Sequence, residues 1–147
     1  TFLLARAGHC PVIYAGVGGT EVIRPGGLGL GMAEGRVFED STEEQVLRLH
    51  DGDVFVMYTD GITEARNSTG EEYGFDRLVE IISQSREMSA DEIKIRILDA
   101  VRTFVGTGTY MDDMTLVVVK WLRQQAHSQL ASMSPTPGVR KQKETRE

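Results

Sequence analysis

The stretch DVFVMYTDGITEARN, residues 53–67, decides the fold that we expect for this sequence. It opens with an uninterrupted apolar run, Val54 to Tyr58, which is too short for a helix and rich in residues that favour strands. Such a run predicts a strand that is buried on both faces. The run ends at Thr59-Asp60-Gly61, where the Asp-Gly pair favours a turn. We therefore expect a carboxylate at the end of a rigid core strand.

A second acidic site also lies at one end of an apolar run. Asp112-Asp113 directly precedes another apolar run, Met114 to Val119. Two buried strands that each carry a carboxylate at one end suit a hard cation such as Mg²⁺ or Mn²⁺. Taken alone, each aspartate is more simply a turn former without chemistry. Because such a cation takes about six oxygen ligands, Asp60 and Asp112 would need a further acidic residue from elsewhere.

The composition is that of an ordinary soluble globular domain, with 147 residues that are 40% hydrophobic and 26% charged. Residues 123–147 hold five of the 16 basic and two of the 22 acidic residues, so residues 1–122 carry a net charge of −9. This charge argues against a nucleic-acid-binding surface. The single cysteine, Cys10, excludes an internal disulfide and fits a reducing compartment, so we expect a cytoplasmic protein. The sequence has no apolar run of about 18 residues, so we expect no membrane contact.

Short strands are expected before the central stretch. Residues 1–7, 12–15 and 20–23, separated by Gly and Pro, predict a meander of antiparallel strands. Residues 36–49 indicate a further extended segment, and a hairpin-type turn at His50-Asp51-Gly52 leads into the central strand. The possible inward positions of that segment are Val37, Val46, Leu47 and Leu49.

Two helices are expected after the central stretch, because the apolar period changes from two to 3.6. The first has its apolar face at Phe75, Leu78, Val79 and Ile82. The second begins at Ser89, and Glu92 three residues later predicts a capping box. Its apolar positions are Ile93, Ile97, Leu98, Val101, Phe104 and Val105. A strand over residues 114–122 follows, which gives one domain over residues 1–122 and a disordered tail over residues 123–147.

Three other motifs suggest chemistry that their residues do not support. His9 and Cys10 are adjacent, so on a strand they point to opposite faces and cannot form a nucleophilic pair. We expect His9 to make a local polar contact and Cys10 to pack. The glycine-rich loop, residues 26–31, lacks the Lys-Ser/Thr of a phosphate-binding loop, so nucleotide binding is a minor alternative. Asp51-Gly52-Asp53 has apolar residues where a calcium loop needs ligands, and predicts a turn.

Five segments together resemble the C-terminal half of the SpoIIE/RsbU-type serine phosphatase domain, a branch of the PP2C (PPM) metal-dependent phosphatases. They occur in the family's order and at its spacing, and they cover residues 1 to about 121. The segments are ARAGHCPVIY (5–14), GGLGLGM (26–32), LHDGDVFVMYTDGITEARN (49–67), GEEYGFDRL (70–78) and DDMTLVVVK (112–120).

The resemblance implies an α+β fold, an α-β-β-α sandwich of two antiparallel sheets flanked by helices. It also implies two Mn²⁺ or Mg²⁺ ions in the complete domain. Asp60, the aspartate of the TDG match, and Asp112, the first aspartate of the DDMT match, would be metal ligands and thus catalytic residues. Gly61 and Asp113 would support them from adjacent positions, with Gly61 allowing a tight turn beside the metals.

The activity implied is hydrolysis of phosphoserine or phosphothreonine by a metal-activated water, without a phosphoenzyme. In this bacterial branch the usual substrate is a phosphorylated anti-sigma-factor antagonist of the STAS type, and a sensor or receiver domain usually lies upstream. The family domain begins with a further segment that carries other metal ligands, so we expect the present chain alone to be inactive. Strand edges without neighbours would favour a dimer. The alternative is a non-catalytic interaction module with this fold and no working metal centre.

Overall fold

The structure is a computed structural model that describes residues 1–108 and 112–123. The strands are β1 (Phe2–Ala5), β2 (Val12–Gly16), β3 (Gly19–Ile23), β4 (Glu44–Leu47), β5 (Val54–Tyr58) and β6 (Leu116–Lys120). The helices are α1 (Arg36–Ser41), α2 (Asp60–Thr63), α3 (Phe75–Ser83) and α4 (Ala90–Val105). The predicted disordered tail lies outside the described residues, apart from Arg123.

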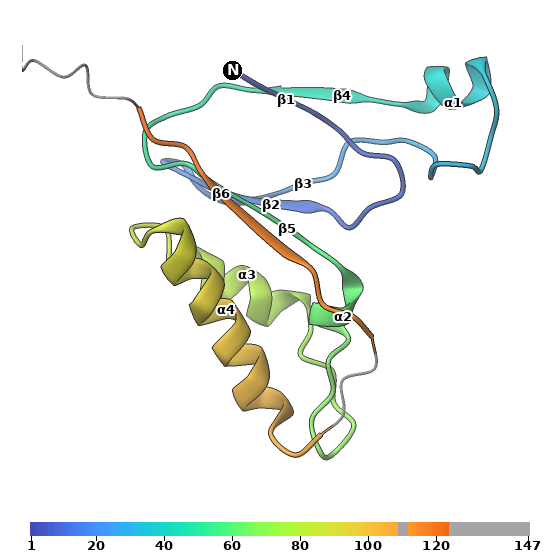
Figure 1. Cartoon of the computed structure of the whole chain (residues 1–147). Helices are drawn as coiled ribbons and strands as arrows, with labels where there is room; N and C mark the ends of the chain where they lie inside the picture. The colour runs from blue at the N-terminus through green and yellow to red at the C-terminus, as the bar shows by residue number, and fades with distance from the viewer. Residues whose placement is uncertain (109–111, 124–147) are drawn as a thin grey trace, which may run out of the picture.

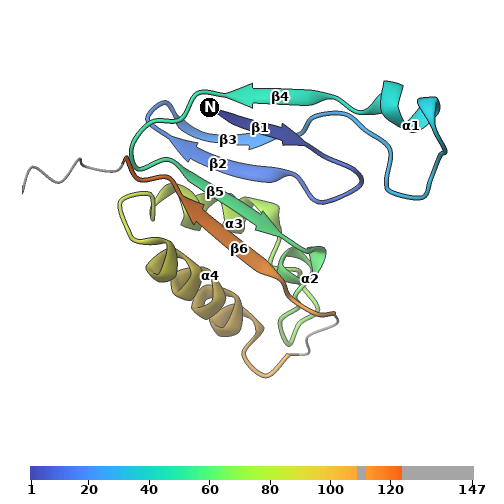
Figure 2. The same cartoon turned by 45° about the horizontal axis from the view of Figure 1, so that its top comes forward.

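The strands form two antiparallel sheets, one with the order β3-β2-β5-β6 and one that pairs β1 with β4. Figure 1 shows α3 and α4 against one face of the four-stranded sheet and the β1–β4 sheet over its other face. Figure 2, in which the top of the molecule is turned forward, separates the strands of both sheets. It shows α1 next to the start of β4. The predicted α+β class, with two antiparallel sheets and flanking helices, is confirmed.

The central strand is buried on both faces, as predicted. Val54, Val56 and Tyr58 contact the cluster beneath α3 and α4. Phe55 and Met57 belong to the second cluster, between the two sheets. Because β5 has β2 on one side and β6 on the other, both edges are also hydrogen-bonded. Because both faces of β5 pack in the core, its residues are apolar throughout and do not alternate with polar ones.

The two predicted helices are confirmed, together with the capping box. Ser89 Oγ accepts a hydrogen bond from the Glu92 N–H at 3.3 Å, and the Ser89 N–H donates to Glu92 Oε2 at 2.8 Å. The buried residues of the helices are Leu78 and Ile82 on α3, and Ile93, Ile97, Val101 and Val105 on α4. In the part of the chain that the structure describes, we find no helix with the length and apolar character to cross a membrane.

The prediction of a three-stranded meander at the start of the chain is wrong. Strands β2 and β3 form the expected hairpin, but β1 pairs with β4 in the other sheet. The chain changes sheets at residues 6–11, where Gly8 has a φ of 84° that other residues rarely adopt. In this position Phe2 covers Phe55, with ring centroids 4.7 Å apart.

The segment 36–49 is only partly extended, because its first six residues form α1. Phe38 O accepts hydrogen bonds from the hydroxyls of Ser41 and Thr42, which stabilise the short helix locally. Two of the four inward positions are wrong: Val37 is 64% and Val46 is 62% exposed, whereas Leu47 and Leu49 pack between the sheets. The turn at residues 50–52 is present, but it connects the two sheets and is not a hairpin turn.

Candidate metal centre

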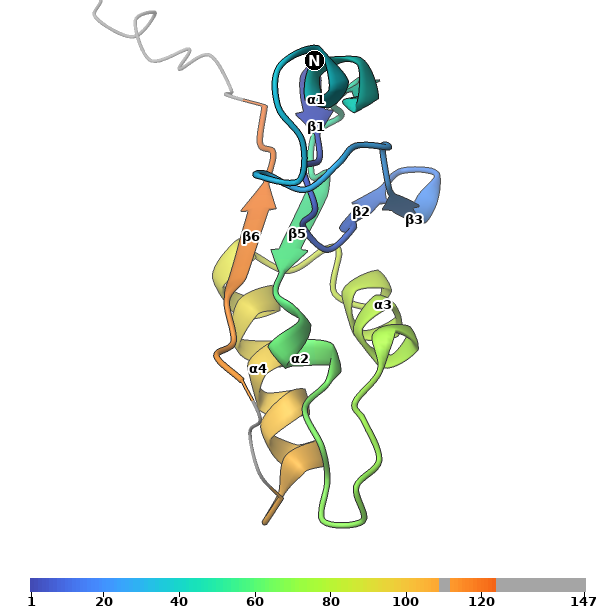
Figure 3. The ribbon, with the colours of Figure 1, turned by 90° about the vertical axis from the view of Figure 1, so that its right-hand side faces the viewer.

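The structure brings the segments of Asp60 and Asp112 to the same end of the four-stranded sheet. Strands β5 and β6 are antiparallel neighbours, with Tyr58 opposite Leu116. The chain that leaves β5 therefore runs beside the chain that enters β6, and the Thr59 N–H donates to Thr115 O at 3.1 Å. Figure 3 looks onto this end of the molecule, where α2 follows directly from β5. Both aspartate side chains are exposed there.

Asp60 begins a single helical turn, α2, where the sequence predicted only a tight turn. Its carbonyl oxygen accepts hydrogen bonds from the Glu64 N–H at 2.8 Å and from the Thr63 hydroxyl at 3.1 Å. Ile62 in the same turn is fully buried. The buried Ile62 fixes this turn to the core and leaves the Asp60 carboxylate at the surface.

Gly61 is needed for space and not for a special backbone angle. Gly61 lies in the single turn of α2 and does not have a positive φ, so the turn does not depend on backbone angles that other residues avoid. A Cβ atom at this position would lie 2.6 Å from Asp113 O and 3.4 Å from Asp112 O. The backbone of the Asp112 segment therefore packs directly on Gly61.

We expect Gly61→Ala to destabilise the protein by about 1–3 kcal/mol, because the added methyl must displace the Asp113 backbone. Gly18→Ala is the matched control, since a Cβ there meets nothing within 4 Å. The control should be neutral or slightly stabilising. Urea unfolding measures both variants, and equal midpoints would contradict this account of Gly61.

Asp113 supports Asp112 through its backbone. The Asp113 N–H donates to Asp112 Oδ1 at 2.7 Å, which holds that carboxylate in one orientation. The Asp113 carbonyl accepts a hydrogen bond from the Thr59 hydroxyl at 3.2 Å. The Asp113 side chain is exposed. Sequence reasoning singled out Asp113 but missed Thr59.

Cys10 lies near Asp60 and is not arranged as a nucleophile. Burial, reinforced by the negative charge of Asp60, raises the pKa of the Cys10 thiol and favours its protonated form. His9 Nδ1 lies 3.1 Å from the Cys10 carbonyl oxygen, so the imidazole contacts the backbone and not the thiol. Cys10 packs against the core cluster. The expected local contact of His9 and the packing role of Cys10 are confirmed.

The donor set fits part of a divalent-cation site. Asp60 and Asp112 supply hard carboxylate oxygens from two adjoining segments, which suits Mg²⁺ or Mn²⁺. However, residues 1–108 and 112–123 contain no group of three or more His, Cys, Asp or Glu side chains placed to hold a metal ion.

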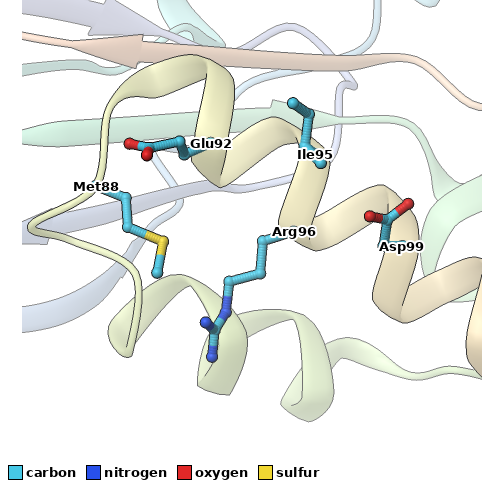
Figure 4. A pocket seen from close by; sticks show the side chains of 5 residues that line it. All are labelled: Met88, Glu92, Ile95, Arg96 and Asp99. Atoms are coloured by element: carbon cyan, nitrogen blue, oxygen red, sulfur yellow. The ribbon is translucent and has the colours of Figure 1, made fainter.

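Two surface hollows within the described residues lack convergent catalytic groups. One lies on α4 and the preceding loop, where Figure 4 shows its lining of Met88, Glu92, Ile95, Arg96 and Asp99. Glu92 there is already used in the capping box. A second, apolar hollow lies between the sheets and reaches Cys10; its other lining residues include Leu4, Met57 and Val117. Neither hollow contains Asp60 or Asp112.

A buried carboxylate lies at the opposite end of β5, at a position where the sequence analysis predicted only a turn residue. Asp53 is fully buried, and its Oδ2 accepts hydrogen bonds from the Tyr14 hydroxyl at 2.9 Å and the His50 N–H at 2.7 Å. Burial of Tyr14 and its hydrogen bond to Asp53 raise the pKa of the Tyr14 hydroxyl to about 12. The only sequence signal is that Asp53 directly precedes an apolar run. Its contacts assign it a structural role.

Solved phosphatase domains of the PP2C class share this fold. The SiaA-PP2C domain of Pseudomonas aeruginosa superposes with a TM-score of 0.63 at 19% identity, over 81% of this chain and 46% of that one. The SpoIIE phosphatase domain of Bacillus subtilis superposes with a TM-score of 0.56 at 17% identity, over 84% of this chain and 52% of that one. A Mycobacterium tuberculosis structure of RsbU and RsbW domains superposes with a TM-score of 0.61 at 21% identity, over 84% of this chain and 34% of that one. The chain therefore has the fold of PP2C-type phosphatase domains.

The family follows from the sequence itself. The model of the family described as stage II sporulation protein E (SpoIIE) matches residues 1–122, and the chain belongs to that family. A relative, protein IcfG of Synechocystis sp., is 30% identical over 119 residues. The match covers 78% of this chain and 17% of IcfG, and the chain spans about half or less of the solved structures described above.

Proposed function

We propose that this chain is part of a metal-dependent protein serine/threonine phosphatase. The observation that carries the proposal is the meeting of Asp60 and Asp112 at adjoining ends of β5 and β6, in a chain of the SpoIIE family. Both carboxylates are exposed. Backbone hydrogen bonds hold the main chain of Asp60 in α2 and the carboxylate of Asp112.

Asp60 and Asp112 would hold Mn²⁺ or Mg²⁺ through their carboxylate oxygens. Such an ion lowers the pKa of water, which can then attack phosphorus, and it offsets charge on the phosphoryl oxygens. Hydrolysis converts the phosphoserine or phosphothreonine ester and one water into the free hydroxyl side chain and inorganic phosphate. This chain's own contribution is to present two carboxylates: α2 places the backbone of Asp60, and the Asp113 N–H orients the carboxylate of Asp112.

The remaining ligands are proposed to lie in another part of the full-length protein. The chain spans 52% and 46% of two of the matching solved domains, so those domains contain chain that has no counterpart here. For this reason we expect residues 1–147 alone to bind two metal ions poorly and to be inactive.

The physiological substrate is proposed to be a phosphorylated STAS-type anti-sigma-factor antagonist, and the setting a cytoplasmic signalling protein with a sensor or receiver domain upstream. The support is the resemblance to SpoIIE and RsbU domains, which extends over residues 1–122. Contact with nucleic acid is not expected, because residues 1–122 carry a net charge of −9. A dimer through free strand edges is also proposed.

The test is Mn²⁺-dependent hydrolysis of p-nitrophenyl phosphate, with residues 1–147 compared with the full-length protein. We expect activity in the full-length protein only. Activity in neither form would instead favour the alternative, a non-catalytic interaction module that keeps the PP2C fold.

A further inference from the structure

Thr59 connects the two segments of the candidate metal centre. Its hydroxyl donates to the Asp113 carbonyl oxygen at 3.2 Å and accepts from the Thr115 N–H at 2.9 Å. Its backbone N–H also donates to the Thr115 carbonyl at 3.1 Å. The residue directly before Asp60 thus makes three hydrogen bonds to the segment that follows Asp112, across sequence separations of 54 and 56 residues.

Asp113 links Thr59 to the Asp112 carboxylate. The Asp113 carbonyl is held by Thr59 and lies against Gly61, where a Cβ would approach it to 2.6 Å. The N–H of the same residue, Asp113, donates to Asp112 Oδ1 at 2.7 Å. The position of Asp113 therefore determines where the Asp112 carboxylate lies relative to Asp60.

The side-chain hydroxyl is the part of Thr59 that makes this connection specific. Valine has nearly the same shape but neither donates nor accepts, so Asp113 O and the Thr115 N–H would each lose a partner. Both lie at the surface, where water can replace the lost bonds at little cost in stability. Water would not, however, fix the spacing between the two segments.

We propose that Thr59 is a positioning residue of the metal centre, whose hydroxyl sets the distance between the Asp60 and Asp112 carboxylates. The inference rests on the proposed function, because it concerns the same two ligands. Residues that orient metal ligands through hydrogen bonds typically change metal affinity by about 10- to 100-fold when removed. We expect a loss of that size for Thr59→Val.

The test uses the full-length protein and three variants: Thr59→Val, Thr59→Ser and the control Thr42→Val. The Thr42 hydroxyl also donates to a backbone carbonyl, Phe38 O at 2.9 Å, but in the α1 segment. Mn²⁺ binding is measured directly from the EPR signal of the free ion, and Mn²⁺ activation from p-nitrophenyl phosphate hydrolysis. We expect weaker Mn²⁺ binding only in Thr59→Val, near-normal binding in Thr59→Ser, and recovery of most turnover in Thr59→Val at saturating Mn²⁺.

Several results would overturn the inference. Unchanged Mn²⁺ affinity in Thr59→Val would show that the hydroxyl has no role. Equal losses in the valine and serine variants would show that a hydroxyl at this position is not sufficient, because serine keeps it. A metal-free Thr59→Val protein that unfolds at much lower urea would make the role purely structural. If the unsubstituted full-length protein binds no Mn²⁺ and hydrolyses nothing, the proposed function itself fails, and the inference with it.

Discussion

Asp60→Asn and Asp112→Asn should each lower Mn²⁺-dependent turnover of the full-length protein by about 10³-fold or more. An amide is a neutral and weaker ligand, and a catalytic metal ion supplies several kcal/mol of transition-state stabilisation. Both side chains are exposed and outside the core, so the fold should remain intact. Loss of one negative charge from an acidic site also relieves repulsion, which leaves stability unchanged or slightly higher.

The matched control is Asp76→Asn, which removes the same charge from an exposed position in the first turn of α3. It should keep normal turnover and normal Mn²⁺ activation. Steady-state rates over a Mn²⁺ titration, together with circular dichroism, measure all three variants. Near-normal activity in Asp60→Asn or Asp112→Asn would defeat the assignment of that residue as a metal ligand.

The largest loss of stability is expected from Ile97→Ala in α4. Ile97 is fully buried against the four-stranded sheet, and removal of its side chain leaves a cavity that costs about 2–5 kcal/mol. Ile95, two residues earlier on the same helix, is 54% exposed and lines the surface hollow shown in Figure 4. Ile95→Ala should change the free energy of unfolding by only about 0.5 kcal/mol.

Because both variants make the same substitution in one helix, their helix-propensity effects cancel in the comparison. Urea unfolding followed by far-ultraviolet circular dichroism gives the two free energies. Similar losses in Ile97→Ala and Ile95→Ala would mean that the buried face of α4 is assigned incorrectly.

The sequence was informative where structure depends on neighbouring residues. The uninterrupted run 54–58 predicted a doubly buried strand, and the spacing of Ser89 and Glu92 predicted the capping box. Both signals are local, because strand burial shows in the run itself and capping involves residues three apart. The carboxylates beside the ends of β5 and β6 were likewise predicted from local order, and the structure places their segments side by side. The prediction that the second strand is also buried is wrong, because β6 lies at the edge of the sheet with Val117 44% and Val119 39% exposed.

The errors concern contacts between distant residues. The pairing of β1 with β4 joins residues about forty positions apart, and alternation within Phe2–Ala5 does not specify a partner. α1 depends on hydroxyl contacts of Ser41 and Thr42 that a strand pattern does not reveal. The close approach of Gly61 to Asp113 is also invisible in sequence, where an Asp-Gly pair simply favours a turn.

The position of β6 in the sheet has a consequence for synthesis of the protein on the ribosome. β6 is the last described strand in the chain, yet it pairs along the whole of β5, and its Leu116 and Val118 pack with the helices. Until β6 leaves the exit tunnel, β5 presents an unpaired apolar edge that can associate with other nascent chains. A premature stop before residue 116 would make that exposure permanent. We therefore expect products of such stop codons to be aggregated or degraded, even though they retain Asp60 and both long helices.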